Sequence, residues 1–498
     1  MDGVSDRTLG AAGEVAAMKP GVVASGGVCF GAGVAAVILL QWWSVVSSAG
    51  WGEVQYVLAL IAMCVVPLGA LHLLRRRDNR FPFFDVGAIC VMVTTLYFVV
   101  PLLNFIFGGM AFTVLSDNRL FTYSPSPGDL APLIWGAVLY LLAFCAVYVM
   151  LRGKGYPHTV GIDAPGGARI GIMILLGVGL GVSILGIEMS YEVSVTPSYE
   201  DFRAGIGSVT QLPYYLQQVV HNLQGMYLVA KQALLLVIVF YWKKRSIRTL
   251  GLTWLLAEII WSVARQGART DVVLLILSAA LLYHRLVRPL SFSRICIGGL
   301  ALLSGVFLVG VVRDLGLSLS EMRGAGVSVL SITNEFQSLF GTAYDLHERS
   351  VRGGLSAIPW TVYLSEVFQL VPSQILPFRK MDPADWYLEL LGPREGGVGF
   401  MFGVLSQGVV GGGPIELLAR GMLLGGVYAA VHRWYVRRSS TWSATLTYLF
   451  VCVWSYYTVR ATTFYFVYFA VYRLAPFLFL TGVGGRVLSA VTPARRSP

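Results

Sequence analysis

Long apolar runs recur along the whole chain, and each is about long enough to cross a lipid bilayer as a helix. The hydrocarbon core of a membrane requires about 20 consecutive apolar residues in a spanning helix. A helix is the expected form because it satisfies its own backbone hydrogen bonds where water is absent. The sequence therefore predicts an all-α, polytopic membrane bundle of about twelve transmembrane helices. The runs lie at residues 22–43, 54–74, 84–107, 131–151, 170–189, 225–242, 249–264, 272–287, 295–312, 414–431, 441–458 and 464–481.

Composition agrees with a chain whose main solvent is lipid. Of its 498 residues, 56% are hydrophobic and 13% are charged, whereas a soluble domain carries about 25% charged residues. A membrane bundle grows by adding helices and needs no second core, so residues 1–498 are expected to form a single membrane domain. The polar first 20 residues and the absence of a convincing cleavage site make the run at 22–43 a retained helix rather than a signal peptide.

The chain has a formal net charge of +11, and its Lys and Arg residues gather in every second connection between the apolar runs. This alternation follows the positive-inside rule and assigns the basic side to the cytoplasm. Both tails, residues 1–20 and 482–498, are then cytoplasmic. Because the cations are spread over several short loops and form no single patch, nucleic acid is not expected as a partner. The basic connections lie at 75–80, 152–169, 243–248, 284–294 and 432–440.

Two connections on the opposite face are long enough to carry function. One occupies residues 190–224 and contains SYEDFRAGIG, and the other occupies residues 313–413 and ends in a glycine-rich stretch. Loops beyond about 15 residues in compact proteins are usually functional or disordered. The second loop is rich in Trp, Tyr, Phe and Pro, so amphipathic helices lying on the bundle are expected there.

Several arginines are predicted at the non-cytoplasmic helix ends, where the positive-inside rule disfavours them. Arg265 and Arg269 lie in RQGARTD, Arg313 follows the ninth run, and Arg460 lies in VRATT. Guanidinium groups bind phosphate oxygens through two-point contacts, so these residues are candidates for an anion site. The alternatives are contact with lipid headgroups or an ion pair between Arg269 and Asp271.

Acids in apolar, helix-compatible surroundings are candidate general bases. Glu335 lies in SITNEFQSL and Glu366 in YLSEVFQL, and a desolvated carboxylate can accept a proton from a hydroxyl group. His347, in YDLHERS, is a third candidate because imidazole titrates near neutral pH. The structural alternatives are a helix cap or an ion pair for the acids, and an ordinary surface position for His347.

Cations and aromatic residues alternate in PFRKMDPADWYLELLGPREGG. Such a pattern suits the apolar faces of sugar rings beside an anionic group, and it suits a membrane interface equally well. Two charges, Glu258 and Arg473, lie inside apolar runs and are expected to be paired, hydrated or functional. The candidate binding residues of this stretch are Arg379, Lys380, Tyr387 and Arg394.

Metal and nucleotide chemistry has no motif in the sequence. The six cysteines form no CxxC pair, and the chain contains no P-loop, no HExxH and no GxSxG. Neither a zinc site nor a disulfide framework is therefore indicated. No metal and no other cofactor are expected.

The order of these motifs resembles the Wzy-type polymerases of lipid-linked oligosaccharide repeat units, and more distantly the O-antigen ligases. The resemblance rests on the many spans and on SYEDFR, which contains Arg203, after the fifth run. It rests further on GARTD at the start of the eighth run, on LVPSQILPFRKMDPADWY, and on GVGFMFGVLSQGVVGGGPIELLARGMLLGG. Gln407 occupies a position at which many relatives have Glu.

The resemblance implies a glycosyltransferase of the bacterial inner membrane that makes O-antigen or exopolysaccharide. It would transfer the growing glycan from undecaprenyl pyrophosphate to the non-reducing end of a new lipid-linked repeat unit, with inversion, at the periplasmic face. The loops at 190–224 and 313–413 would be periplasmic. The leaving pyrophosphate would be neutralised by Arg269, Arg313 and Arg460. The first candidate for the base that deprotonates the acceptor hydroxyl would be Glu335. A protein that sets chain length is an implied partner.

Two other classes remain open from the sequence. A ligase uses the same lipid-linked donor and differs only in its acceptor, so the residues do not separate it from a polymerase. A non-enzymatic transporter of lipid or solute is expected to place charges near the middle of the membrane around broken helices. The unusual cations are instead predicted at helix ends on one face, which favours an interfacial enzyme.

Overall fold

Helices make up most of the chain in the computed structural model. The described residues are 51–79, 81–108, 112–116, 119–123, 125–153, 155, 161–193, 212–264, 269–315, 334–355, 357–372, 375–378, 380–391 and 401–491. The helices are α2 (Trp51–Asp78), α3 (Val86–Gly108), α4 (Pro127–Leu151), α5 (Gly167–Tyr191), α7 (Tyr214–Phe240), α8 (Arg245–Ala264), α9 (Arg269–Leu286), α10 (Phe292–Leu315), α12 (Asn334–Val351), α13 (Trp360–Tyr363), α14 (Ser365–Phe368), α15 (Pro383–Leu391), α16 (Val404–Val410), α17 (Gly413–Arg437), α18 (Trp442–Trp454), α19 (Tyr457–Arg460), α20 (Tyr465–Phe469), the π-helix η3 (Ala470–Leu474) and α21 (Ala475–Val491).

Six helices within the described residues are long and apolar enough to cross a membrane. They are α2, α4, α5, most of α7, α17 and the stretch Tyr465–Leu488, and shorter apolar helices cover Val86–Leu102 and Phe292–Leu302. The predicted helical membrane protein is confirmed at this level. The first predicted span, 22–43, lies outside the described residues. The total of about twelve spans and their sidedness stay predictions.

One link departs from the all-α expectation. Strand β1 (Phe112–Ser116) pairs antiparallel with strand β2 (Arg119–Tyr123), with Phe112 opposite Tyr123. The sequences FTVLS and RLFTY are rich in β-branched and aromatic residues, which favour extended pairing over a helix. The link between α3 and α4 is therefore a hairpin.

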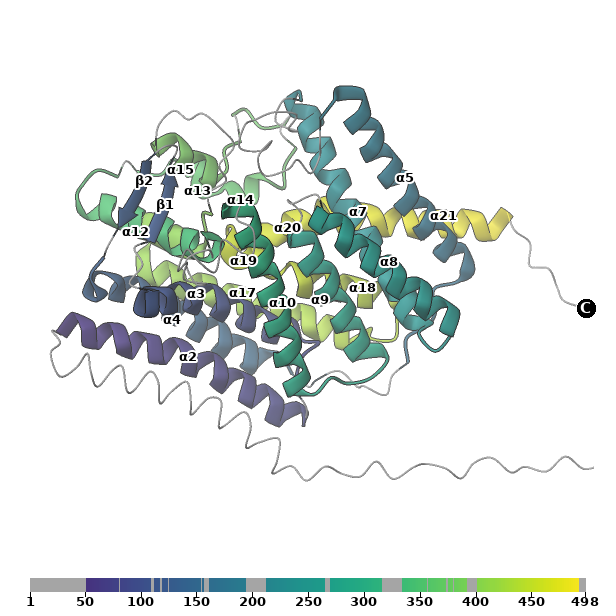
Figure 1. Cartoon of the computed structure of the whole chain (residues 1–498), viewed down its shortest axis with the longest axis horizontal. Helices are drawn as coiled ribbons and strands as arrows, with labels where there is room; N and C mark the ends of the chain where they lie inside the picture. Colours follow the sequence, from purple (N-terminus) through teal and green to yellow (C-terminus); the bar gives the residue numbers. More distant parts are fainter. Residues whose placement is uncertain are drawn as a thin grey trace, which may run out of the picture.

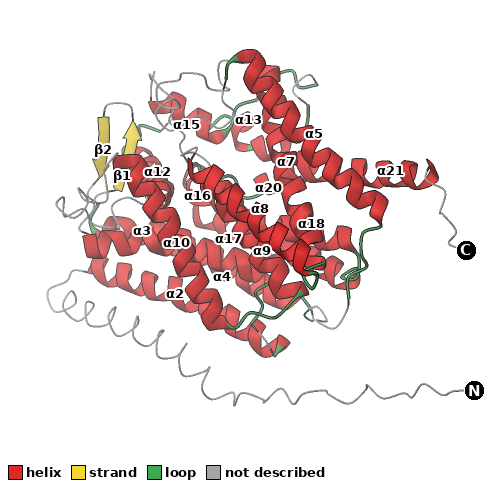
Figure 2. Cartoon of the chain, turned by 45° about the vertical axis from the view of Figure 1, so that its right-hand side comes forward, coloured by secondary structure: helices red, strands yellow, loops and turns green. Residues whose placement is uncertain are grey.

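Most of the described residues in the region predicted as a long loop at 313–413 are helical. Within α12, Leu339, Phe340, Ala343 and Leu346 are buried while Ser350 is exposed, so the helix is amphipathic. Its buried face packs on α3, α16 and β1, and the rings of Phe340 and Phe98 lie 5.9 Å apart. In Figures 1 and 2, α12, α13, α15 and the hairpin gather at one end of the bundle, while α21 runs out on the opposite side.

Helix α4 forms the centre of the best-packed part of the bundle, with α2 and α17 against it (Figure 1). Gly421 and Gly425 of α17 face the α4 backbone. A Cβ atom on Gly421 would lie 2.4 Å from the Tyr140 carbonyl oxygen, and one on Gly425 would lie 2.7 Å from that of Phe144. Small residues four apart allow close approach of helices in lipid. This approach fixes the position of α17, which carries the polar groups described below.

We expect Gly421→Leu to destabilise the folded protein by about 1–3 kcal/mol, because a larger side chain cannot enter the contact between α17 and α4 without moving backbone. Thermal unfolding of the purified protein in detergent measures the effect. Gly426→Leu on the same helix is the matched control, since a Cβ atom on Gly426 would have no neighbouring atom within 4 Å. Equal losses in both variants would contradict the proposed packing role of Gly421.

Candidate functional site

The Glu366 carboxylate is the centre of a polar network that joins the region between α12 and α16 to the last helices. Glu366 lies in the short helix α14, and its side chain is 11% exposed. Its Oε1 accepts hydrogen bonds from Gln407 Nε2 and from the Phe464 backbone N–H, both at 3.1 Å. Its Oε2 accepts from Arg420 Nη1, also at 3.1 Å. One side chain thus ties α14 to α16, α17 and the start of α20.

Arg420 bridges two carboxylates. Its Nε donates to Glu416 Oε1 at 2.6 Å, one helical turn earlier on α17, while Nη1 reaches Glu366. The side chains of Arg420 and Glu416 are 11% and 8% exposed. Buried charges persist only when they are paired and hydrogen-bonded. The three groups therefore form one ionic unit that requires α17 and α14 to stay in contact.

The glycine-rich stretch before α17 makes room for Glu416. The Gly412 backbone N–H donates to Glu416 Oε2 at 2.6 Å, and a Cβ atom on Gly411 would lie 1.9 Å from that oxygen. Gly413 has a φ of +62°, a left-handed conformation that glycine adopts without strain. The GGG sequence thus turns the chain from α16 into α17 and lets backbone approach the carboxylate.

Gln407 and Thr463 complete the network. Gln407 Oε1 accepts hydrogen bonds from the Thr463 backbone N–H at 3.0 Å and from its hydroxyl at 2.9 Å. These bonds orient the amide so that its Nε2 faces Glu366. A glutamate at this position would place a second carboxylate against Glu366 and would lack the amide donor. Gln407 therefore suits the charge distribution of this particular site.

Tyr363 of α13 lies close enough to the ionic unit for Glu416 and Arg420 to act on the pKa of its hydroxyl. Burial, followed by the hydrogen bond to Glu416, raises the pKa of the Tyr363 phenol above its ordinary value. The neutral phenol is thereby favoured at physiological pH. A neutral hydroxyl next to the ion pair can both donate and accept a hydrogen bond.

The charges of this network exclude one role and favour another. Two carboxylates face one guanidinium, so the unit carries an excess of negative charge. A phosphate group would be repelled by the carboxylates, whereas hydroxyl groups of a sugar are suitable donors to them. The arrangement of Glu366, Glu416, Gln407 and Tyr363 is thus suited to polar neutral ligands.

The other candidate residues predicted from the sequence fall into three groups. Arg203, Arg265, Arg379 and Arg394 lie outside the described residues. Arg269 begins α9, Arg313 lies in the last turn of α10, and Glu335 lies in the first turn of α12. The connection between α9 and α10 covers only residues 287–291, so the start of α9 and the end of α10 lie at the same end of this pair. The remaining residues, His347, Lys380, Tyr387 and Arg460, have described side chains.

Three of these four residues have a described contact other than with Glu366. The Lys380 ammonium donates to the Val371 carbonyl, and burial lowers the pKa of Lys380. Tyr387 is fully buried and donates to Asp345 Oδ2 at 2.8 Å, so its ring packs inside the α12 and α15 contact. His347 is half-buried on α12. The Arg460 guanidinium lies 5.8 Å from the centre of the Tyr457 ring.

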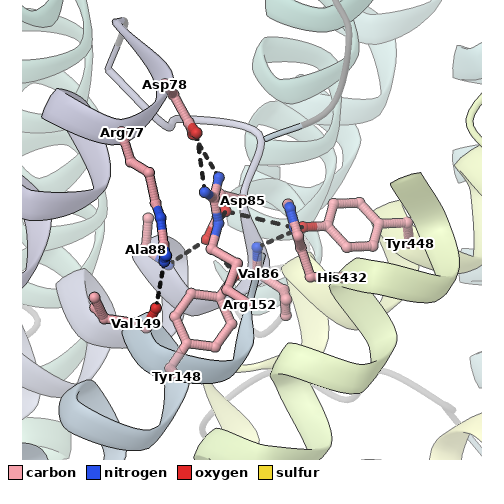
Figure 3. Close-up of polar contacts among 10 residues, drawn as sticks. All are labelled: Arg77, Asp78, Asp85, Val86, Ala88, Tyr148, Val149, Arg152, His432 and Tyr448. Carbon is pink, nitrogen blue, oxygen red and sulfur yellow. Dashed lines mark hydrogen bonds and ion pairs between the residues drawn. The ribbon is translucent and has the colours of Figure 1, made fainter. Parts of the chain in front are cut away.

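A second ionic network lies at the junction of α2, α3, α4 and α17 (Figure 3). The Arg152 guanidinium donates to both oxygens of Asp78, at 3.0 and 2.5 Å, and to Asp85 Oδ2 at 2.6 Å. Asp85 Oδ1 accepts from Tyr148 Oη at 2.7 Å and from the Ala88 backbone N–H at 2.9 Å. Asp85 thereby caps the start of α3.

Helices α17 and α18 close this second network. His432 Nδ1 lies 2.7 Å from Tyr448 Oη and 3.5 Å from Asp85 Oδ2. Tyr448 Oη also accepts from the Val86 backbone N–H at 3.0 Å. Arg152, Asp85 and His432 side chains are 0% exposed. With these three side chains out of a substrate's reach, the cluster is a structural lock between helices.

Sequence reasoning missed Glu416, Arg420 and Thr463 as site residues. The usable signal was present in GGGPIELLAR, where an acid and an arginine four residues apart lie on one face of a helix. The spacing of Asp78, Asp85 and Arg152 offered no such signal.

No family model, no curated protein and no solved structure matches this chain.

Proposed function

We propose that this chain is a membrane glycosyltransferase that polymerises undecaprenyl-pyrophosphate-linked oligosaccharide repeat units. The observation that supports the proposal is the Glu366, Arg420 and Glu416 network, which combines buried carboxylates with amide, hydroxyl and phenol groups. Such a set of groups is suited to binding the hydroxyls of a sugar acceptor. The site belongs to the end of the bundle that is predicted to face the periplasm, as the resemblance to Wzy-type polymerases requires.

The reaction follows from the groups assigned to it. The acceptor hydroxyl attacks the anomeric carbon of the donor, its proton passes to a carboxylate, and the bond to undecaprenyl pyrophosphate breaks with inversion. Glu366 is held by three hydrogen bonds, one of them from a guanidinium, which suits the binding and orientation of the acceptor. Glu335, at the start of α12, is the proposed base, because α12 packs against α16, the helix that carries Gln407.

Arginines are the proposed counter-charges for the leaving pyrophosphate. Arg269, Arg313 and Arg460 belong to helix ends at the predicted periplasmic face, and guanidinium groups stabilise phosphate charge that develops in the transition state. Arg203, Arg265, Arg379 and Arg394 remain proposed contacts to the pyrophosphate or the glycan. No metal is required by this scheme.

Purified protein incubated with a synthetic lipid-linked repeat unit is expected to give a ladder of polymers by mass spectrometry. Glu335→Gln should lower the transfer rate by about a hundredfold or more while the protein stays folded, since an amide cannot accept the proton. Glu366→Gln should lower both the rate and the thermal stability, because its amide nitrogen would face Arg420. Long polymers from Glu335→Gln, with none from Glu366→Gln or His347→Ala, would show that the base is misassigned.

A transporter of an anionic lipid is the second candidate, and the last helices favour it. The chain from α18 to α21 is broken at residues 455–456 and 461–464 and contains a π-helix with the buried Arg473. Broken helices and buried charge are features of transport sites. Movement of a fluorescent lipid-linked substrate across proteoliposomes, without any glycan ladder, would favour transport over transfer. A single addition to a second acceptor would favour a ligase.

A further inference from the structure

Arg473 is a buried cation whose guanidinium lies among aromatic rings. It belongs to η3 inside the candidate span Tyr465–Leu488, and the residue is 4% exposed. Its guanidinium carbon lies 3.9 Å from the centre of the Phe469 ring and 5.0 Å from that of Trp454. A helical side chain reaches back toward the preceding turn, so the guanidinium is directed toward the start of α20. It therefore lies on the side of η3 that leads to Phe464 and Glu366.

The Arg473 guanidinium donates no hydrogen bond to any residue that the structure describes, and its Nε is fully buried without an acceptor. Ring faces attract a cation but accept none of its five N–H groups in the way an oxygen does. An unsatisfied buried charged group is costly, and charges inside membrane proteins are normally paired or functional. The unsatisfied Nε of Arg473 therefore requires an explanation.

Three other cations that are shielded within the described residues show the ordinary solution. Lys231 pairs with Glu258 at 2.5 Å, Arg152 with two aspartates, and Arg420 with two glutamates. Asp271 is near enough to interact electrostatically with Arg473, but no ion pair within 4.0 Å joins them. Arg473 differs from these cations because no carboxylate of the described residues pairs with it, although an acid is within electrostatic range.

The backbone around Arg473 is shaped to hold this side chain. A Cβ atom on Gly225 of α7 would lie 2.0 Å from Arg473 Cδ and 2.2 Å from its Nε, so only glycine permits the observed approach. The π-helical turn inserts one extra residue into the helix, a feature that occurs frequently at functional sites. Two independent local features thus place an unpaired guanidinium at one position.

We propose that Arg473 binds a phosphate-type oxyanion inside the bundle, and that the anion is the phosphate or pyrophosphate headgroup of a lipid. A guanidinium fork matches phosphate oxygens in two-point contacts, and a setting of low polarity strengthens them. The candidate span that holds Arg473 continues into α21, which exposes Phe479, and α5, which packs against α21 and α7, exposes Val178. Exposed apolar side chains are expected of helices that face acyl chains. The lipid part of this inference rests on the proposed function.

Arg473 and the Glu366 network lie apart on the same stretch of chain, so they can bind different parts of one ligand. Phe464, which donates to Glu366, and Arg473 lie on the continuous stretch from α20 into η3, and nine residues correspond to about 14 Å of helix. The carboxylate-rich network repels phosphate, while Arg473 attracts it. A lipid-linked sugar would then bind with its glycan toward Glu366 and its phosphate toward Arg473.

The test measures binding of undecaprenyl pyrophosphate to the purified full chain in detergent, with undecaprenol and inorganic pyrophosphate as comparison probes. Arg473→Met is expected to weaken the binding of undecaprenyl pyrophosphate roughly tenfold or more, as when a two-point ionic contact is lost. Its melting temperature without ligand should equal or exceed that of the wild type, since a buried unpaired charge has been removed. Arg438→Gln is the matched control, because Arg438 also lies over a ring, that of Trp434, but is exposed.

Unchanged affinity of Arg473→Met for undecaprenyl pyrophosphate would overturn the proposal. A lower melting temperature in the same variant would then show that Arg473 only stabilises the packing of the bundle. Arg473-dependent binding of inorganic pyrophosphate without binding of the lipid would overturn the lipid source. If Arg473→Met does not fold, Gly225→Ala keeps the charge but displaces the guanidinium, and wild-type affinity in that variant would also count against the site. Lipid binding that depends on Arg473, in a protein that makes no polymer, would separate a correct anion site from a wrong proposed function.

Discussion

Replacement of Arg420 by methionine is expected to destabilise the folded protein by about 3–5 kcal/mol and to abolish glycan transfer. The variant leaves Glu366 and Glu416 without their counter-charge, although their side chains are only 11% and 8% exposed. Removing one partner of a buried ion pair costs far more than the pair itself contributes, because the remaining charge stays desolvated. Thermal unfolding together with the polymer ladder measures both effects.

Companion variants separate loss of pairing from loss of fold. Arg420→Lys should recover only part of the stability, since an ammonium cannot reproduce the fixed fork that reaches two carboxylates and Thr463. Adding Glu366→Gln and Glu416→Gln to Arg420→Met should restore stability without restoring transfer. Arg437→Met, at the exposed end of the same helix, should change stability by less than about 0.5 kcal/mol. Wild-type stability in Arg420→Met would refute the ionic unit.

Replacement of Arg152 by methionine is expected to have a stability effect of similar size, about 3–5 kcal/mol, without a direct effect on chemistry. The Arg152 and Asp85 side chains are 0% exposed and Asp78 is 13% exposed, so both carboxylates would lose a buried partner. Because Asp85 also caps α3 and contacts Tyr148, the loss should spread to the packing of α3 against α4 (Figure 3). Unfolding in detergent measures the loss.

Arg77 provides the matched control for this second prediction. Its Nη1 donates to the Val149 carbonyl at 2.6 Å, but the residue is exposed, so its loss strands no buried carboxylate of the second network. Arg77→Met should therefore cost at most about 1.5 kcal/mol, as for one hydrogen bond. Combining Arg152→Met with Asp78→Asn and Asp85→Asn should recover much of the stability. If Arg152→Met lost no more stability than Arg77→Met, the second network would not hold the helices together as proposed.

The sequence alone determined which segments become helices. A bilayer leaves no solvent for free backbone groups, so an apolar run of sufficient length has a helix as its stable form. Local chemistry also marks some ends, as where Ser126 and Asp129 form a capping box at the start of α4. The hairpin at Phe112–Tyr123 was missed because short β-branched runs between spans carry a weak signal.

Only the tertiary structure decided which polar groups meet. Glu366 and Arg420 are 54 residues apart in sequence, and Asp85 and Arg152 are 67 apart. An apolar pattern predicts that a helix crosses the membrane, but it does not predict which helices pack against it. Those neighbours depend on close-packing positions such as Gly421. The acid at Glu366 could be proposed from the sequence, whereas its partners could not.

The two intramembrane charges found in the sequence illustrate the same division. Glu258 and Arg473 both stand inside apolar runs, and nothing in those runs distinguishes them. The packing of α7 against α8 brings Lys231 within 2.5 Å of Glu258. At Arg473, in contrast, α7 contributes Gly225 and α18 contributes the ring of Trp454. Sequence determined that each charge lies within an apolar segment. Tertiary contacts decided that one is neutralised by the protein and the other is left for an anion, because pairing depends on what lies across the helix interface.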